Sequence, residues 1–294
     1  MKMTIITPSF NQGEFLSATI DSVLNQNVTE MEYWVIDGGS TDESVAILRS
    51  FRDRLQWVSE KDGGQTDAVN KGLRRARGEI IGWLNSDDVY YPGACRRVLD
   101  YFDSHPEAQV IYGNADHIDR GGAWLEEYPT EEWNYDRLFE TCFLCQPAVF
   151  FRRSVVEKFG LLDDRLHYCM DYEYWLRLGR QVVFHHLPEK LAGSRLYAET
   201  KTLGAKSAVH HEILEMLYKK TGKSSFLWLS NYGHAVAADA GMLRGTPEQE
   251  WRFTRVVCRA FLMESWRVYH RISPRDVRTL GSWLWKAWRK ANGN

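Results

Sequence analysis

The sequence has little net charge and no long hydrophobic run. Its 294 residues include 37 Lys and Arg and 39 Asp and Glu, so the formal net charge of −2 gives no electrostatic basis for nucleic-acid binding. No apolar stretch approaches the roughly 18 residues of a membrane-spanning helix, and Met1-Lys2-Met3 leads straight into a short strand instead of a signal peptide. The sequence therefore predicts a cytoplasmic protein, with peripheral contact at the inner face of a membrane left open.

Cysteine is also scarce, and the five residues form no even framework. Cys142 and Cys145 make a lone C-x-x-C pattern without a second pair at metal-ligand spacing. We interpret the cysteines as small buried residues of a protein from a reducing compartment.

Aromatic residues, in contrast, are abundant. The chain has 12 Trp and 14 Tyr, and apolar residues make up 44% of it, which is enough for a sizeable core. Trp and Tyr suit surfaces that are partly apolar and partly hydrated, such as the platforms on which sugars stack and membrane interfaces.

Strand-like and helix-like segments alternate from the first residues onward. Short strands are predicted at 3–7, 33–36, 56–59 and 80–84, and helix-like segments with apolar residues at helical spacing lie between them. This alternation is typical of βαβ units, so we expect an α/β fold with a mostly parallel, Rossmann-like central sheet. Residues 110–112 and 143–151 also look like strands, and 119–122 has the composition of a hairpin turn.

The last third of the sequence is different in character. From about residue 206 it is helical in pattern and rich in Trp and basic residues. We expect an α/β domain over 1–205 and a C-terminal helical region over 206–294 that serves oligomerisation or membrane association.

Polar residues mark the expected starts of three helices. Asn11 is placed to cap the first helix, and Ser40 with Glu43 and Ser154 with Glu157 have the spacing of capping boxes.

Two adjacent carboxylates, Asp87 and Asp88, follow the predicted strand at 80–84. Two like charges about 4 Å apart repel by roughly 4 kcal/mol at the effective dielectric near a protein surface. A basic side chain, a metal ion or water must offset this repulsion.

Three predicted strands end in polar residues, at Thr7-Pro8-Ser9, Asp37-Gly38-Gly39 and Asp87-Asp88. The carboxyl ends of the strands in an open α/β sheet form its ligand-binding crevice, so we expect the three acids on one rim. Acids without an adjacent Lys or Arg favour Mg²⁺ or Mn²⁺ together with a polyphosphate ligand. The alternative is a set of aspartates that only serve turns and helix caps.

Several segments together resemble family-2 glycosyltransferases, which have the GT-A nucleotide-sugar fold. The matching segments are TPSFN at 7–11, VIDGGSTD at 35–42, DGGQTDAVNKG at 62–72, SDD at 86–88 and MDYEYWLR at 170–177. They occur in the family's order over roughly residues 3–202.

The resemblance implies a role for each matching position. Thr7, Pro8 and Ser9 would line the nucleoside, Asp37 would accept a hydrogen bond from an imide-type N–H of the base, and Asp62, Gln65 and Asp67 would shape the base and sugar pocket. Asp87 would contact the ribose or the sugar, Asp88 would bind the metal, and Asp171 would be the general base. An acid is not needed to protonate a leaving group that a metal ion stabilises, and one positioned carboxylate suffices for a single inverting displacement.

Two positions depart from the family pattern. Met170 stands where the family commonly has an acid, which leaves Asp171 as the base and Glu173 as the alternative. Tyr197 replaces the His of the family's R-x-H-x-x-S-x-S segment. Arg195 and Lys201 can pair with phosphate oxygens, or they are solvated surface charges.

The sequence thus predicts a metal-dependent, inverting glycosyltransferase that uses a nucleotide-diphosphate donor, with a UDP-sugar favoured. Its acceptor would be a hydroxyl of a glycan or of a lipid-linked cell-envelope saccharide. An inactive binding or scaffold protein on the same fold is one alternative. A sugar-nucleotide pyrophosphorylase is another, although residues 7–13 lack the basic loop it would need.

The end of the chain suggests a second interaction. Leu280, Leu284 and Trp288 share a helical face, with basic residues close by. A helix of this kind suits the headgroup region of an anionic membrane. The alternative is that its tryptophans pack on the catalytic domain or on a second copy in a homo-oligomer.

Overall fold

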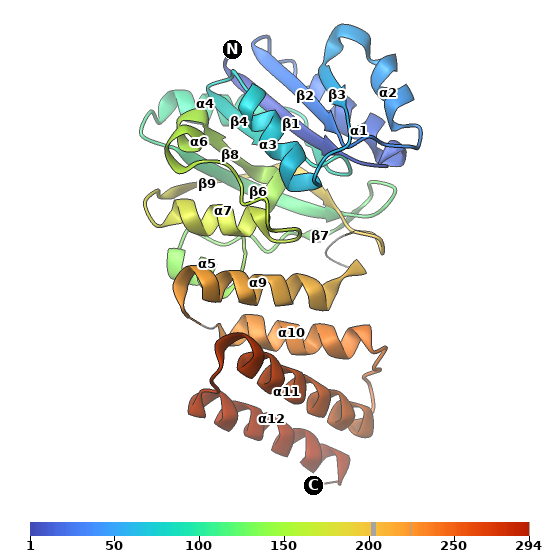
Figure 1. The fold of residues 1–294 in the computed structure, drawn as a ribbon, viewed down its shortest axis with the longest axis vertical. Helices are drawn as coiled ribbons and strands as arrows, with labels where there is room; N and C mark the ends of the chain where they lie inside the picture. Colours follow the sequence, from blue (N-terminus) through green and yellow to red (C-terminus); the bar gives the residue numbers. More distant parts are fainter. Residues whose placement is uncertain (201–203, 224, 294) are drawn as a thin grey trace. The chain divides into compact units, whose positions relative to one another are not determined.

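The computed structural model describes residues 1–200, 204–223 and 225–293, and it divides into two compact units (Figure 1). The α/β unit comprises Met1–Leu138 and Cys142–Tyr197. The helical unit comprises Phe139–Thr141 and Ala198–Asn294.

One sheet forms the centre of the α/β unit, with the strand order β3-β2-β1-β4-β8-β6-β9-β5 and β7 paired to β6. The strands are β1 Met3–Ser9, β2 Met31–Asp37, β3 Gln56–Ser59, β4 Ile80–Trp83, β5 Val89–Tyr90, β6 Val110–Ile118, β7 Trp124–Glu127, β8 Val149–Arg152 and β9 Phe184–Arg195. The strand predicted at 56–59 has the observed bounds.

The sheet changes character along this order. From β3 to β4 all neighbours are parallel, as the alternation of strands and helices predicts, and β1 is buried along its whole length. β8 then pairs antiparallel with β4 and β6, and β5 pairs antiparallel with β9. β6 and β7 form the hairpin predicted around 119–122. The strand expected at 143–151 is wrong for its first half, because a 3-10 turn, η2 at Gln146–Ala148, precedes β8.

Helices pack against this sheet and connect its strands. They are α1 Gly13–Leu24, α2 Ser44–Ser50, α3 Gln65–Arg75, α4 Ala94–Ser104, α5 Tyr135–Glu140, α6 Arg153–Phe159 and α7 Met170–Gly179, with a further 3-10 turn, η1, at Arg52–Arg54. Gly72 lets α3 approach β1 closely, since a Cβ there would lie 2.3 Å from Cγ2 of Ile6.

The three predicted helix caps are wrong. Asn11 does not cap α1; its Oδ1 accepts the backbone N–H of Thr41 at 2.8 Å. α2 begins only at Ser44, so Ser40 and Glu43 form no capping box. α6 begins at Arg153 without a side-chain cap, so the pair at 154 and 157 forms none either. In the first two cases the polar side chains near the helix starts hold neighbouring loops together instead.

The helical unit contains α9 Lys206–Thr221, α10 Phe226–Asp239, α11 Pro247–Tyr269 and α12 Pro274–Ala291, which lie one beside the next in Figure 1. Thr246 and Gln249 form a capping box at the start of α11. Phe253 and Val257 of α11 pack with Ala237 of α10 in a small core. None of the helices in the described residues is long and apolar enough to cross a bilayer.

Candidate functional site

The loops that follow β1, β2 and β3 are bonded to one another at the carboxyl edge of the sheet. The backbone N–H of Gly38 donates to the carbonyl of Ser9 at 2.8 Å, and that of Glu60 donates to the carbonyl of Asp37 at 3.0 Å. Gly38 also lies against Asp62, because a Cβ at Gly38 would be 2.9 Å from Oδ2 of that carboxylate. The three loops therefore form one surface, as the topology predicts.

Asp37 is fully buried and its carboxylate is bonded to its own loops. Oδ2 accepts the N–H groups of Gly39 and Ser40 at 3.2 and 2.9 Å and the hydroxyl of Ser59 at 2.6 Å. Oδ1 accepts the hydroxyl of Ser40. These bonds fix the turn after β2, and the contact with a nucleobase that the resemblance implies stays a prediction.

Thr7, Pro8 and Ser9 all lie in the buried β1 strand. The hydroxyls of Thr7 and Tyr33 share a hydrogen bond of 3.1 Å. The buried hydroxyl of Ser9 has no hydrogen-bond partner in the described part of the chain. Leaving a buried polar group unsatisfied costs about 1–3 kcal/mol, so a partner from outside the chain would be stabilising here.

The segment at 62–72 shapes the entrance to α3. Oδ1 of Asp62 accepts the N–H of Gly64 at 2.8 Å, and Oδ2 of Asp67 accepts that of Gly63 at 3.1 Å. The Gly63 bond is the main reason why the pKa of Asp67 is lowered, and an ion pair with Lys71 at 3.3 Å contributes. Both acids therefore hold this loop in shape.

Asn85 connects this segment to the acidic doublet, a role that the sequence analysis missed. Its Oδ1 accepts from Nε2 of Gln65 at 2.8 Å and from Nε1 of Trp83 at 2.9 Å. Its Nδ2 donates to Oε1 of Gln146 at 2.9 Å and lies 3.3 Å from Oδ2 of Asp88. The only sequence signal was its place beside the acids, since Gln65 and Gln146 lie 20 and 61 residues away along the chain.

Asp88 is buried, with 4% of its surface exposed. Its Oδ1 accepts the backbone N–H of Arg195 at 2.8 Å, and no side chain in the described ranges forms an ion pair with it. Burial, together with the negative charge of Asp87, raises the pKa of Asp88 to about 8. Burial and the neighbouring charge therefore both favour the neutral form of this carboxyl.

Asp87 is held by the last residue of β9 and by Tyr197, which follows that strand. Its Oδ2 accepts the phenol O–H of Tyr197 at 3.0 Å, and its backbone carbonyl accepts Nε of Arg195 at 2.7 Å. The Tyr197 ring packs on Phe15 with centroids 4.9 Å apart, and Arg120 lies over both rings. The tyrosine at the family's histidine position is thus in direct contact with the doublet.

Arg195 is not a solvated surface charge, because only 6% of it is exposed. Its Nη1 donates to the carbonyls of Asp119 and Arg120, each at 2.8 Å, and its guanidinium lies over the ring of Phe15 at 4.9 Å. Pairing with a phosphate stays a prediction. Lys201 lies outside the described residues.

Asp171, the second residue of α7, is half-buried. Asp171 and Asp88 both raise the pKa of the buried Cys145, after the larger effect of burial. Oδ1 of Asp171 accepts the backbone N–H of Tyr172 at 2.7 Å, and the role of Asp171 as the general base stays a prediction. All five cysteines are free thiols, and only Cys142 is not fully buried.

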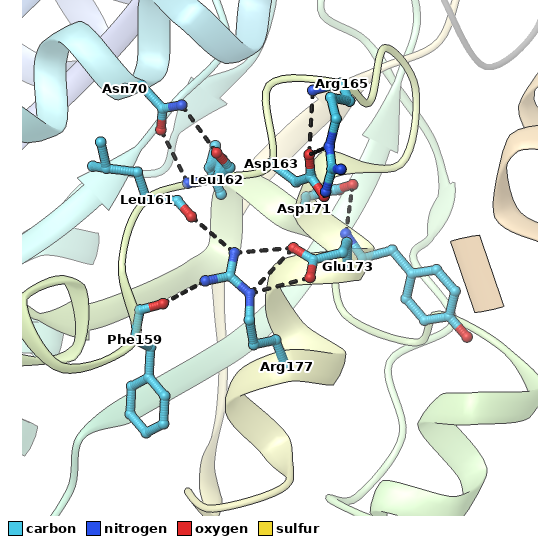
Figure 2. A network of polar contacts seen from close by, with 10 residues as sticks. Asn70, Phe159, Leu161, Leu162, Asp163, Arg165, Asp171, Glu173 and Arg177 are labelled. Atoms are coloured by element: carbon cyan, nitrogen blue, oxygen red, sulfur yellow. Dashed lines mark hydrogen bonds and ion pairs between the residues drawn. The ribbon is translucent and has the colours of Figure 1, made fainter. Parts of the chain in front are cut away.

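Glu173, the alternative base, is 1% exposed and forms an ion pair with Arg177 one turn further along α7, with Oε2 and Nη2 3.0 Å apart (Figure 2). Arg177 also donates to the carbonyls of Phe159 and Leu161 at 2.5 and 2.8 Å. Asn70 forms two hydrogen bonds with the backbone of Leu162: its Nδ2 donates to the carbonyl, and its Oδ1 accepts the N–H. Glu173 is therefore part of the network that fixes this loop.

The doublet offers oxygen ligands of the kind that hard divalent cations prefer. Within the ranges that the structure describes, no group of three or more His, Cys, Asp or Glu side chains could hold a metal ion. The residues present fit a cation that has one or two protein carboxylates and takes its other ligands from phosphates and water.

Solved structures with this fold include several glycosyltransferases. Residues 1–349 of TarS from S. aureus, solved in complex with UDP-GlcNAc, superpose with a TM-score of 0.63 at 15% identity, covering 98% of this chain and 90% of that one. A mannosyltransferase from Pyrobaculum calidifontis, in complex with GDP-Man and Mn²⁺, has a TM-score of 0.57 at 15% identity, with 99% and 86% covered. The α/β unit thus has the GT-A fold, the fold class of nucleotide-sugar transferases.

The sequence places the chain within that class. Residues 4–160, more than half of the chain, match the family described as Glycosyl transferase family 2, and the chain belongs to this family. It is 27% identical over 254 residues to an uncharacterized glycosyltransferase of Rickettsia prowazekii, covering 81% of this chain and 78% of that protein. It is 26% identical to chondroitin synthase of Escherichia coli, covering 68% of this chain and 30% of that longer protein.

Proposed function

We propose that the chain transfers a sugar from a nucleotide-diphosphate donor, with a UDP-sugar favoured, to an acceptor hydroxyl with inversion at the anomeric carbon. The observation that supports this proposal best is the buried Asp88, which lies beside Asp87 and is linked through Asn85 to Gln65 of the segment at 62–72. A divalent cation held by one carboxylate would stabilise the leaving diphosphate, and a second carboxylate beside the acceptor would take its proton; together they suffice for a single displacement.

The donor would lie on the loops after β1, β2 and β3. Thr7, Pro8 and Ser9 would line the nucleoside, and the partnerless hydroxyl of Ser9 supports a ligand contact there. Asp37 would accept an imide-type N–H, which uracil provides at N3 and guanine at N1. Structures with this fold were solved in complex with UDP-GlcNAc and with GDP-Man, which supports a donor with either base.

The sugar and diphosphate would lie closer to the doublet. Asp62, Gln65 and Asp67 would shape the sugar side of the pocket, Asp87 would contact the ribose or the sugar, and Arg195 would face a phosphate. These roles follow the family resemblance, and the bond from Gln65 to Asn85 supports them because it joins the two groups of loops.

Asp88 would hold Mn²⁺ or Mg²⁺. The bound ion would stabilise the negative charge that develops on the departing diphosphate. Asp88 would bind the ion as a carboxylate, and the neighbouring Asp87 would add a second negative charge that attracts the cation.

Asp171 would remove the proton of the acceptor hydroxyl. It lies in the first turn of α7 and is half-buried. Glu173 would have to give up its ion pair with Arg177 to act in its place. The acceptor would be a glycan or a lipid-linked saccharide, and we assign the reaction to residues 1–205 and association functions to residues 206–294.

Calorimetry with UDP and GDP, each with and without Mn²⁺, tests the donor site directly. We expect metal-dependent binding of one of them, and loss of the metal dependence in Asp88→Asn. Asp103→Asn, an exposed aspartate on α4, is the control. No binding of either nucleotide by the folded wild-type protein would overturn the proposal.

Transfer to water or to an acceptor tests the base. Asp171→Asn should bind the nucleotide as the wild type does but lose turnover, whereas Glu173→Gln should mainly lower stability. Normal turnover in Asp171→Asn together with loss in Glu173→Gln would assign the base to Glu173.

A further inference from the structure

The two last helices concentrate positive charge. Residues 247–293 hold ten Lys and Arg against four Asp and Glu, whereas the whole chain has a net charge of −2. The rest of the chain is therefore clearly acidic. Such an asymmetry is typical of a segment that meets an anionic partner.

α12 has three distinct faces. Leu280 and Ala287 are buried, whereas Val277, Trp285 and Trp288 are 50%, 55% and 45% exposed. Val277, Leu284, Trp285 and Trp288 are spaced by seven, eight and eleven residues, so they share one helical face. The third face holds exposed basic residues, namely Arg275, Arg278, Lys286, Arg289 and Lys290. The tryptophans at 285 and 288 are thus not packed in a core.

α11 presents a second stripe of the same composition. Arg252, Arg255, Arg259, Met263 and Trp266 are all exposed and follow each other at intervals of three or four residues. Met263 and Trp266 are 60% and 61% exposed. This helix face therefore has a basic half and an apolar half.

Most of these cations have no acidic partner. In the described part of the chain, no ion pair involves Arg252, Arg255, Arg259, Arg278, Lys286 or Arg289. Two of the guanidinium groups lie over tryptophan rings instead, Arg255 over Trp251 at 5.6 Å and Arg289 over Trp285 at 4.9 Å. Elsewhere on the protein, exposed arginines such as Arg120 and Arg137 pair with glutamates.

We propose that α12, together with the exposed stripe of α11, binds the surface of an anionic lipid bilayer. Trp285 and Trp288 would enter the headgroup region, where tryptophan is favoured, and the flanking Arg and Lys side chains would pair with lipid phosphates. α12 would lie in the plane of the interface, because it has exposed apolar residues along one side only.

The observations favour a bilayer over other occupants. A second copy of the chain would bring two surfaces of the same positive sign together, which is unfavourable. A nucleic acid would match the arginines, but it would leave Val277 and Leu284 without a role. The surface consists of helical-unit residues only, so it stands independently of the proposed reaction.

Flotation of the full chain with lipid vesicles tests this surface. We expect binding to vesicles with about 30% phosphatidylglycerol, little binding to pure phosphatidylcholine, and loss of binding in about 0.5 M NaCl. Trp285→Ala combined with Trp288→Ala should lower the partition coefficient at least about tenfold. Trp124→Ala removes an equally exposed tryptophan from β7 and should change nothing.

Variants that lack two of the arginines measure the electrostatic contribution to vesicle binding. Each arginine removed should lower partitioning about fivefold, so Arg278→Gln with Arg289→Gln should lower it roughly 20-fold. Arg49→Gln with Arg74→Gln, two exposed arginines of the α/β unit, is the control. Binding that does not depend on lipid charge, or that is unchanged in both sets of variants, would overturn the proposal. Tighter binding to DNA than to vesicles would also overturn it, and so would a dimer that is lost in the tryptophan variant. Nucleotide binding should be unchanged in all variants, which separates this result from the fate of the proposed reaction.

Discussion

Tyr197→Phe removes a single hydrogen bond from the acidic doublet. The phenol O–H donates to Oδ2 of Asp87 at 3.0 Å, while the ring packs on Phe15 at 4.9 Å and lies under Arg120 at 5.4 Å. Phenylalanine keeps the ring contacts. The change therefore tests Tyr197 as a positioning residue that acts through Asp87.

The size of the effect follows from the chemistry of the bond. A hydrogen bond to a charged group contributes about 1.5–3 kcal/mol. Asp87 is half-buried, so water replaces part of the lost bond and the lower end of the range applies. We expect UDP to bind roughly tenfold more weakly in the presence of Mn²⁺, which corresponds to about 1.4 kcal/mol.

Isothermal calorimetry with UDP and Mn²⁺ measures this change, and Tyr91→Phe is the matched control. That variant also removes a phenol–carboxylate bond, from Tyr91 to Asp116 at 2.9 Å, but it leaves Asp87 untouched. Unchanged UDP affinity in Tyr197→Phe, or an equal loss in the control, would show that Tyr197 does not position the doublet.

Three further predictions concern stability and the loops. Gly72→Ala should lower stability by about 1–3 kcal/mol in thermal unfolding because its Cβ would lie 2.3 Å from Ile6, whereas Gly281→Ala, with nothing within 4 Å, should be neutral or stabilising. Burial lowers the pKa of His210 to about 4. As the pH falls, the histidine of the unfolded state is therefore protonated before that of the folded state, and about 3 kcal/mol of stability is lost between pH 6.5 and pH 4. His210→Phe should therefore flatten the fall of the unfolding midpoint between these pH values, and an unchanged profile contradicts this. Asn85→Ala should weaken UDP binding and lower the midpoint together, because it disconnects the doublet from α3; normal affinity would exclude that role.

Most of the strands could be predicted from local sequence patterns. The parallel strands β1 to β4 have apolar runs that end at turn residues, so their positions follow from the sequence alone. Parts of β6 and β8 and the turn between β6 and β7 were also predicted, but the pairing of β6, β8 and β9 was not, because these strands pair across long stretches of chain with no shared periodic signal.

The helix caps failed for a related reason. Asn11 and Ser40 have the residue types that cap helices, but they bond to loops about 30 residues away or to an adjacent turn. Asp42 instead accepts the first N–H of α1, at Gly13, from another part of the chain. Polar residues in loops that meet at a ligand-binding edge have several partners to choose from, and only the fold decides among them.

The choice between Asp171 and Glu173 shows the same limit at the catalytic position. Both acids lie in the first turn of α7, and their spacing in the sequence does not favour one of them as the base. Two residues apart on a helix, they point in different directions. Glu173 is buried and pairs with the half-buried Arg177, whereas Asp171 stays half-buried. To act as the base, Glu173 would have to give up its ion pair with Arg177, so we expect Asp171 to be the acid that accepts the proton of the acceptor hydroxyl.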